Sequence, residues 1–155
     1  MLETIKGTRI AVVVALMSIP LAAISGQTCK VCSLMTTAEA AQILGRPKVA
    51  ATKPVSFDDK QCFYGESGFL VLELEDMDAA QQKAGLKSLV KQNKAEPVSG
   101  IGDEAVFWQI GDSLLMVRKG IRLVTVTLSR NWGGPPAQLR PTLLKVAKTA
   151  LAKLR

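Results

Sequence analysis

The segment from Val98 to Arg130 constrains the fold of this 155-residue chain more than any other part of the sequence. It contains three runs of apolar and β-branched residues, separated by Gly111-Asp112 and by Gly120, which is typical of consecutive antiparallel strands. The runs are Glu104–Ile110, Ser113–Lys119 and Ile121–Arg130. Phe107 and Trp108 fall on opposite faces of the first run, so we expect that strand to be central and covered on both sides.

The rest of the chain alternates between helical and strand patterns. A capping box, Thr36 with Glu39, predicts a short helix that ends at Gly45, and Pro47 is expected to prevent its continuation. The other expected helices are Asp78–Lys94 and Gln138–Arg155, and the other expected strands are Lys48–Val55, Gln61–Tyr64 and Phe69–Glu75. Hairpin strands punctuated by helices predict an α+β fold, with an antiparallel sheet of about five to six strands and three helices.

The first part of the chain has the organisation of a secretory signal peptide, which we assign to residues 1–26. Two basic residues precede a short apolar run, Ile10–Ala23, and cleavage after Ser25 or after Gly26 fits the small-residue rule equally well. A membrane anchor is the less favoured alternative, because a spanning helix needs about 20 apolar residues and this run also contains Pro20. We therefore expect an exported protein, periplasmic or secreted, with a single domain over residues 27–155.

The chain is basic, with a formal charge of +7 that becomes +6 once the charged residues of the signal peptide are removed. An exported basic protein is attracted to anionic phospholipid, lipopolysaccharide or cell-wall polymers. The cations are spread along the chain without a nucleic-acid-binding module, so nucleic acid is not an expected partner. We expect the partner to be a protein or a component of the cell envelope, and the sequence leaves the oligomeric state open.

Three cysteines are the first candidates for chemistry. A bridge between Cys32 and Cys62 would close a loop of about 30 residues and contribute roughly 3 to 4 kcal/mol in the chain-entropy model. The alternative is a redox or metal-binding pair, Cys29-x-x-Cys32, although thioredoxin-like motifs follow a strand in a βαβ unit. Gln27 and Thr28 make a poor lipobox before Cys29. The sequence leaves open whether Cys29 is a free thiol, forms a disulfide or is lipidated.

A catalytic constellation is not evident. The sequence contains no His, which removes most nucleophilic triads and the usual neutral-pH general base. The carboxylate pairs Asp58-Asp59 and Asp103-Glu104 are more typical of solvated turns than of an acid and base pair. Gly100-Ile-Gly102 is a poor phosphate loop, because acidic residues follow it and no helix begins there. We expect no catalytic residue, no metal site and no cofactor, and we predict that the protein is not an enzyme.

Two surface features remain as candidates for binding. Trp132 lies in a loop with Gly-Gly-Pro-Pro, where an aromatic side chain can anchor a partner or fold back over the edge of the sheet. The basic C-terminal helix can contact an anionic membrane surface or simply pack its apolar stripe on the sheet.

Five short pieces of the mature chain, taken together, resemble a group of small exported bacterial proteins of unknown function, often described as lipoproteins or hypothetical secreted proteins. The pieces are Cys32–Glu39, Gly45–Pro47, Cys62-x-Tyr64, Gly100–Ala105 and Val117–Gly120. The resemblance implies that Cys32 pairs with Cys62 and that the fold is α+β, and it implies no catalytic residue. The weak lipobox departs from the anchored members.

The sequence thus predicts a non-enzymatic exported binding or interaction domain of unknown ligand, stabilised by a disulfide. The first alternative is a thiol-redox or metal accessory protein that uses Cys29 and Cys32. The second alternative is attachment to the envelope surface through the basic C-terminal helix.

Overall fold

The structure is a computed structural model of the 155-residue chain. It describes residues 30–51, 54–56, 58–66, 69–92, 94–110 and 112–154. The expected signal peptide, its cleavage positions and Cys29 lie outside the described residues and stay predictions.

Within the described residues the chain forms seven strands, four α-helices and three short 3₁₀ helices. The strands are β1 (Val55–Ser56), β2 (Gln61–Tyr64), β3 (Leu70–Asp76), β4 (Glu96–Val98), β5 (Glu104–Ile110), β6 (Asp112–Lys119) and β7 (Arg122–Leu128). The α-helices are α1 (Thr37–Leu44), α2 (Pro47–Ala51), α3 (Ala79–Lys91) and α4 (Leu139–Lys153). The 3₁₀ helices are η1 (Val31–Leu34), η2 (Arg130–Trp132) and η3 (Pro136–Gln138). None of these helices is both long and apolar enough to cross a bilayer.

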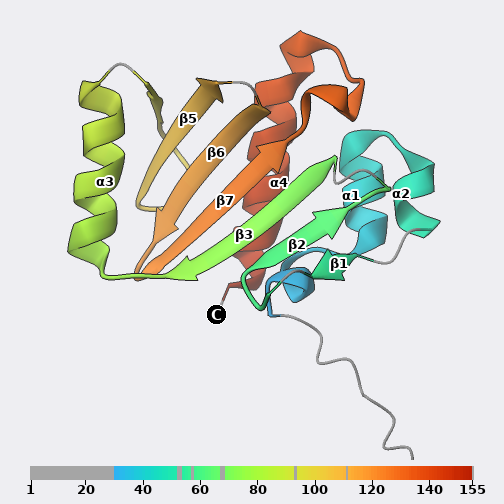
Figure 1. Ribbon diagram of the computed structural model, residues 1–155, viewed down its shortest axis with the longest axis horizontal. Coiled ribbons are helices and arrows are strands. Elements are labelled where there is room, and N and C mark those ends of the chain that lie inside the picture. The colour runs from blue at the N-terminus through green and yellow to red at the C-terminus, as the bar shows by residue number, and fades with distance from the viewer. Residues whose placement is uncertain are drawn as a thin grey trace, which may run out of the picture.

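The strands form one sheet in the order β1-β2-β3-β7-β6-β5-β4, and every neighbouring pair is antiparallel (Figure 1). The predicted α+β fold is therefore confirmed, with seven strands rather than five to six and four α-helices rather than three. The unexpected strand β4 has only three residues, and one of them is Pro97. Proline cannot donate to a strand ladder, so it is suited to this edge position, where a sequence pattern gives little strand signal.

The segment between α1 and β2 differs from expectation. α1 begins at the predicted capping box and ends at Gly45, whose left-handed φ of 64° closes the last turn. Pro47 does not stop helix formation but begins α2, because the first position of a helix needs no backbone N–H and suits the φ of proline. The predicted strand Lys48–Val55 is therefore wrong, and in the described part of this segment the two residues of β1 pair with β2.

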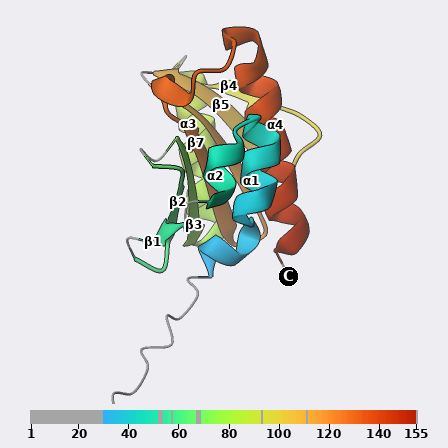
Figure 2. The ribbon, with the colours of Figure 1, turned by 90° about the vertical axis from the view of Figure 1, so that its right-hand side faces the viewer.

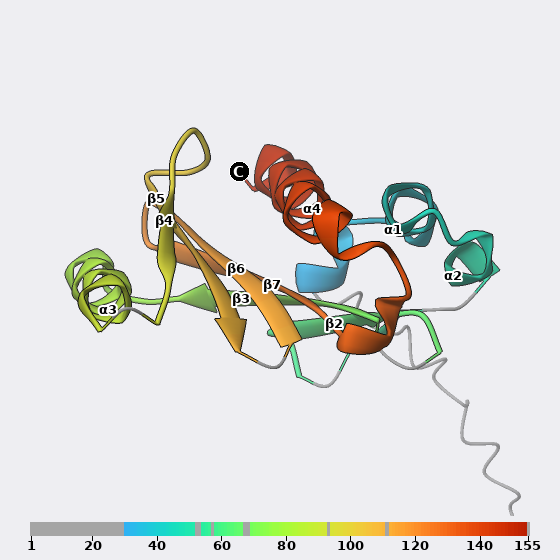
Figure 3. The same cartoon turned by 90° about the horizontal axis from the view of Figure 1, so that it is seen from above.

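α1, α2 and α4 cover one face of the sheet, as the view from above shows (Figure 3). Side chains from these helices, from η1 and from the inward-facing positions of five strands form the main core. Its largest fully buried members include Met35, Tyr64, Leu70, Leu72, Leu115, Leu128 and Leu143. α4 lies across β6 and β7, so the predicted apolar stripe of the C-terminal helix packs on the sheet.

α3 covers the opposite face at the β5 end and forms a second, smaller core. Leu86 and Val106 are buried there, and the partly buried Trp108 and Met116 pack against them. Phe107 lies in the main core, because successive side chains on a strand point to opposite faces. β5 is therefore covered on both sides, as expected. It is not central, because β4 lies outside it and β7 occupies the middle of the sheet.

A disulfide joins η1 to β2. The sulfurs of Cys32 and Cys62 are bonded, and their Cα atoms lie 5.2 Å apart. Two residues further along β2, the buried Tyr64 hydroxyl donates a 2.7 Å hydrogen bond to the Met35 carbonyl. The predicted bridge is thus present, and a second buried bond beside it ties the same two segments together.

Candidate functional site

The helix α3 carries a row of lysines along its exposed side. Lys83, Lys87 and Lys91, which we call the lysine row, recur at four-residue intervals and therefore lie on one face of the helix. The helix contains no Asp or Glu to offset them. Each like-charged pair at this spacing destabilises a helix by about 0.2 to 0.5 kcal/mol, and Gly85 costs about 1 kcal/mol more. α3 thus carries a concentrated positive charge on its exposed side.

Two lysines of the row have no compensating charge in the part of the chain that the structure describes. The Lys83 ammonium lies 3.8 Å from the Glu104 carboxylate. Lys87 and Lys91 form no ion pair with any residue that the structure describes, and both are exposed. The two lysines at the C-terminal end of α3 are therefore exposed positive charges that no described carboxylate pairs with.

A groove of about 420 Å³ runs beside the row, between α3 and the strands β4 and β5. Its apolar lining comes from Leu86 and Val90 on the helix and from Pro97, Val98, Ala105 and Val106 on the strands. Lys87 and Lys91 border it on the helix side, and Asp103 and Glu104 border it on the strand side. An apolar floor with charged borders is typical of a site that binds an amphiphilic group.

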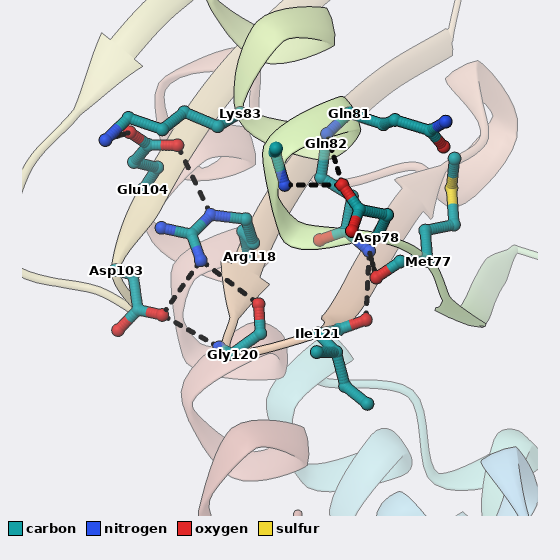
Figure 4. A network of polar contacts seen from close by, with 11 residues as sticks. Met77, Asp78, Gln81, Gln82, Lys83, Asp103, Glu104, Arg118, Gly120 and Ile121 are labelled. Carbon is teal, nitrogen blue, oxygen red and sulfur yellow. Dashed lines mark hydrogen bonds and ion pairs between the residues drawn. The ribbon is translucent and has the colours of Figure 1, made fainter.

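The acidic border is neutralised by Arg118, as Figure 4 shows. The Arg118 side chain is only 13% exposed, and its Nε donates to Glu104 at 3.3 Å while its Nη1 donates to Asp103 at 3.2 Å. The Asp103 carboxylate also accepts a 2.8 Å hydrogen bond from the Gly120 backbone N–H. The two carboxylates are thus committed to one guanidinium, to Lys83 and to the backbone, which leaves a net positive border at Lys87 and Lys91.

The same contacts explain the Gly100–Glu104 motif. Gly102 has a φ of +62°, and a Cβ there would lie 2.6 Å from the Arg118 carbonyl oxygen. The Asp103 N–H donates to that carbonyl at 2.8 Å, and Arg118 Nη1 donates to the Gly120 carbonyl at 3.0 Å. The motif clamps the β6–β7 hairpin to the start of β5. It is a structural element, and it also shapes one wall of the groove.

The N-terminal end of α3 is tied to the same hairpin. The Asp78 carboxylate caps the helix by accepting from the N–H groups of Ala80 and Gln81, at 2.9 and 3.1 Å. The buried Gln82 amide donates to the Ile121 carbonyl at 3.0 Å. These bonds, visible in Figure 4, fix where α3 and its lysines lie relative to the sheet.

The site residues expected from the sequence lie elsewhere. Cys32 and Cys62 form the structural disulfide, and Cys29 lies outside the described residues. Trp132 is 6% exposed and belongs to the main core, so of the two alternatives the structure favours packing over a binding surface. Asp58 accepts from the Lys60 N–H at 3.0 Å, which is the behaviour of a turn residue. Among the described residues, no three His, Cys, Asp or Glu side chains lie close enough together to hold a metal ion.

The four-residue spacing of the α3 lysines is visible in the sequence, but the groove beside them is not. The groove depends on β4, which was missed, and on the pairing of two carboxylates with an arginine in the next strand.

No protein-family model matches this chain, and comparisons with curated proteins and with solved structures gave no match. Function is therefore inferred from the site itself.

Proposed function

We propose that this protein is an exported, non-enzymatic binding domain that contacts an anionic lipid surface of the cell envelope through the lysine row and the groove beside it. One observation carries the proposal. Lys87 and Lys91 are exposed and uncompensated within the described residues, and they border an apolar groove whose carboxylates already have partners. A lipid with a negative headgroup and an apolar chain complements both parts of this surface.

Export is supported by two independent features. The N-terminal sequence has the organisation of a signal peptide, and the Cys32–Cys62 disulfide is compatible with an oxidising compartment. In such a compartment the domain meets the anionic components that its basic charge attracts.

A binding role is favoured over the two alternatives by particular contacts. In the thiol-redox alternative Cys29 pairs with Cys32, but the Cys32 sulfur is bonded to Cys62. In the second alternative α4 attaches the protein to the envelope, but the apolar stripe of α4 is buried against the sheet. Lys145 and Lys148 are exposed on α4 and form no ion pair with any described residue, so they provide a matched control for the lysines of α3.

The test is co-sedimentation of residues 27–155 with vesicles of phosphatidylcholine alone and with vesicles that also contain phosphatidylglycerol. A lysine near an anionic surface contributes about 1 kcal/mol, so the double variant K87Q/K91Q should bind anionic vesicles roughly 30-fold more weakly than wild type. The control K145Q/K148Q removes the same formal charge from α4 and should bind within about twofold of wild type.

Three results would contradict the proposal. Equal losses in the two double variants would show that only net charge matters. Equal binding to neutral and anionic vesicles would remove the electrostatic premise. No binding to either vesicle, combined with K87Q-sensitive binding to an acidic protein, would assign the surface to a protein partner instead.

A further inference from the structure

A second pocket lies at the end of the sheet opposite α3, where α1 and α2 lie side by side (Figures 1 and 2). It has a volume of about 400 Å³ and lies between the junction of these helices and the turn that joins β2 to β3. Its side-chain lining comes from Arg46, Pro47, Lys48, Val49, Glu66 and Phe69. The volume is at the lower end of the range of about 300 to 1,000 Å³ that is typical of small-molecule sites.

Arg46 is held in this pocket by three separate parts of the chain. Its backbone N–H donates to the Ala41 carbonyl at 2.9 Å and so closes the last turn of α1. Its guanidinium lies over the Phe69 ring, 5.0 Å from the centroid. It also lies against Gly133, where any side chain would overlap it. The guanidinium therefore packs between the Phe69 ring and Gly133.

Arg46 nevertheless has no anionic partner among the residues that the structure describes. Among the arginines whose side chains the structure describes, Arg118, Arg122 and Arg140 each form an ion pair with a carboxylate. Arg46 forms no ion pair or side-chain hydrogen bond with any described residue, although it is partly buried. A guanidinium offers five N–H donors in a planar fork that matches a carboxylate. A partly buried guanidinium that has no ion pair with a described residue, beside an apolar pocket, is suited to bind an anion.

We propose that this pocket binds a small monocarboxylate with an apolar body. The carboxylate would accept hydrogen bonds from Arg46, and the body would lie against Phe69, Val49 and Pro47. Glu66 lines the same pocket and opposes a second negative charge on the ligand, which favours a single carboxylate over a dianionic phosphate. This site is separate from the α3 surface and does not depend on it.

The proposal is tested by isothermal titration calorimetry of residues 27–155 with octanoate, with octylammonium as the charge control and acetate as the chain control. Octanoate should bind, and the other two should bind at least tenfold more weakly, because each lacks one half of the complementary chemistry. R46Q should weaken octanoate binding by at least about tenfold, since a hydrogen bond to a charged group is lost. R46K should give an intermediate loss, because it keeps the charge without the fork.

A matched control is available in the chain. Arg140 also lies over an aromatic ring, 5.3 Å from the Phe107 centroid, but it is paired with Glu96. R140Q should leave octanoate affinity unchanged, as should K87Q/K91Q. Melting curves recorded for each variant confirm that it is folded. Gly133→Ala adds a Cβ that displaces the Arg46 guanidinium without removing its charge, so it should also weaken octanoate binding. Gly120→Ala is the control, because Gly120 also has a positive φ but a Cβ there contacts nothing, and it should leave octanoate affinity unchanged.

The proposal fails if wild type does not bind octanoate at millimolar concentration, if octylammonium binds equally well, or if folded R46Q binds octanoate as wild type does. None of these results bears on vesicle binding by the lysine row, and loss of vesicle binding does not affect this test.

Discussion

The disulfide between Cys32 and Cys62 should account for a large part of the stability of this domain. The two residues are 30 positions apart in sequence. For a loop of that length the chain-entropy model gives about 3.6 kcal/mol at 25 °C. A domain of this size is typically stable by about 5 to 15 kcal/mol, so loss of the bridge should remove a quarter or more of the total.

The cleanest measurement uses the Cys29→Ser variant, which removes the third thiol and prevents exchange. Its urea unfolding curve is recorded with and without dithiothreitol. The sequence is the same in both curves, so no cavity term enters the difference. We expect the free energy of unfolding to fall by about 3 to 4 kcal/mol on reduction and the denaturant slope to rise, because the reduced unfolded chain is more expanded. C29S/C32A/C62A should be insensitive to reductant.

Two outcomes would refute this reasoning. A fall of less than about 1 kcal/mol on reduction would mean that the 30-residue loop is already constrained in the unfolded chain. A large loss caused by Cys29→Ser alone, without reductant, would mean that Cys29 takes part in the stabilising bridge. Peptide mapping under non-reducing conditions separates these cases.

Three further predictions concern stability. Gly102→Ala should lower the free energy of unfolding in urea by about 2 kcal/mol or more, because it adds a clash with the Arg118 carbonyl to the strain of a positive φ. Gly100→Ala is the control: Gly100 also has a positive φ but open space around it, so the loss should be only about 1 to 2 kcal/mol. The Lys153 ammonium, and then the Thr36 backbone N–H, hold the pKa of Glu39 below its ordinary value of 4.5. The wild-type advantage over E39Q should therefore be present near neutral pH and disappear as pH falls through that lowered pKa; an advantage that grows in acid would contradict this sign. Trp132→Ala should cost about 3 to 5 kcal/mol without a selective loss of vesicle binding, whereas a stable variant that no longer binds vesicles would show that Trp132 contacts the partner.

Most of the longer elements could be predicted from the sequence, because the apolar residues of each recur with the period of a strand or of a helix. The strands β2, β3, β5, β6 and β7 and the helices α3 and α4 lie within three residues of their expected bounds. The short elements α2, β1 and β4 could not be predicted, because α2 begins at a proline, β1 has only two residues and β4 contains a proline, whereas the four residues of β2 include strand-forming aromatic side chains. Their conformation is set by neighbours: β1 and β4 exist because β2 and β5 offer them an edge.

The candidate site was only half visible in the sequence for a similar reason. A two-residue turn at Gly111-Asp112 would place Lys119 opposite Glu104 in the β5–β6 hairpin. The observed pairing joins Ile110 to Asp112 and so places Arg118 opposite Glu104. A difference of one residue in register thus decides which side chain neutralises the acidic border of the groove. Turn residues alone did not specify that register.

Four of the five sequence pieces behind the resemblance to small exported proteins come together in space as two structural clamps. Cys32 pairs with Cys62 and Met35 accepts from Tyr64 in the first, while Asp103 and Arg118 hold the β6–β7 hairpin in the second. Such pieces specify a fold and not a ligand, because the lysine row lies outside all of them. A chain could keep both clamps and change its partner by changing only α3.

The piece Gly45-Arg46-Pro47 belongs to neither clamp. Gly45 is explained by the left-handed turn that ends α1, and Pro47 is explained by the start of α2. Nothing in the backbone requires arginine between them, because the hydrogen bond to Ala41 uses only the main-chain N–H of Arg46. Stacking on Phe69 contributes about 0.5 to 1 kcal/mol at an exposed site, and Lys or an apolar residue could supply similar packing. The contribution of Arg46 to folding stability therefore does not explain why this position carries a guanidinium. Binding of a carboxylate ligand, as proposed above, would explain it, because the planar fork matches two carboxylate oxygens.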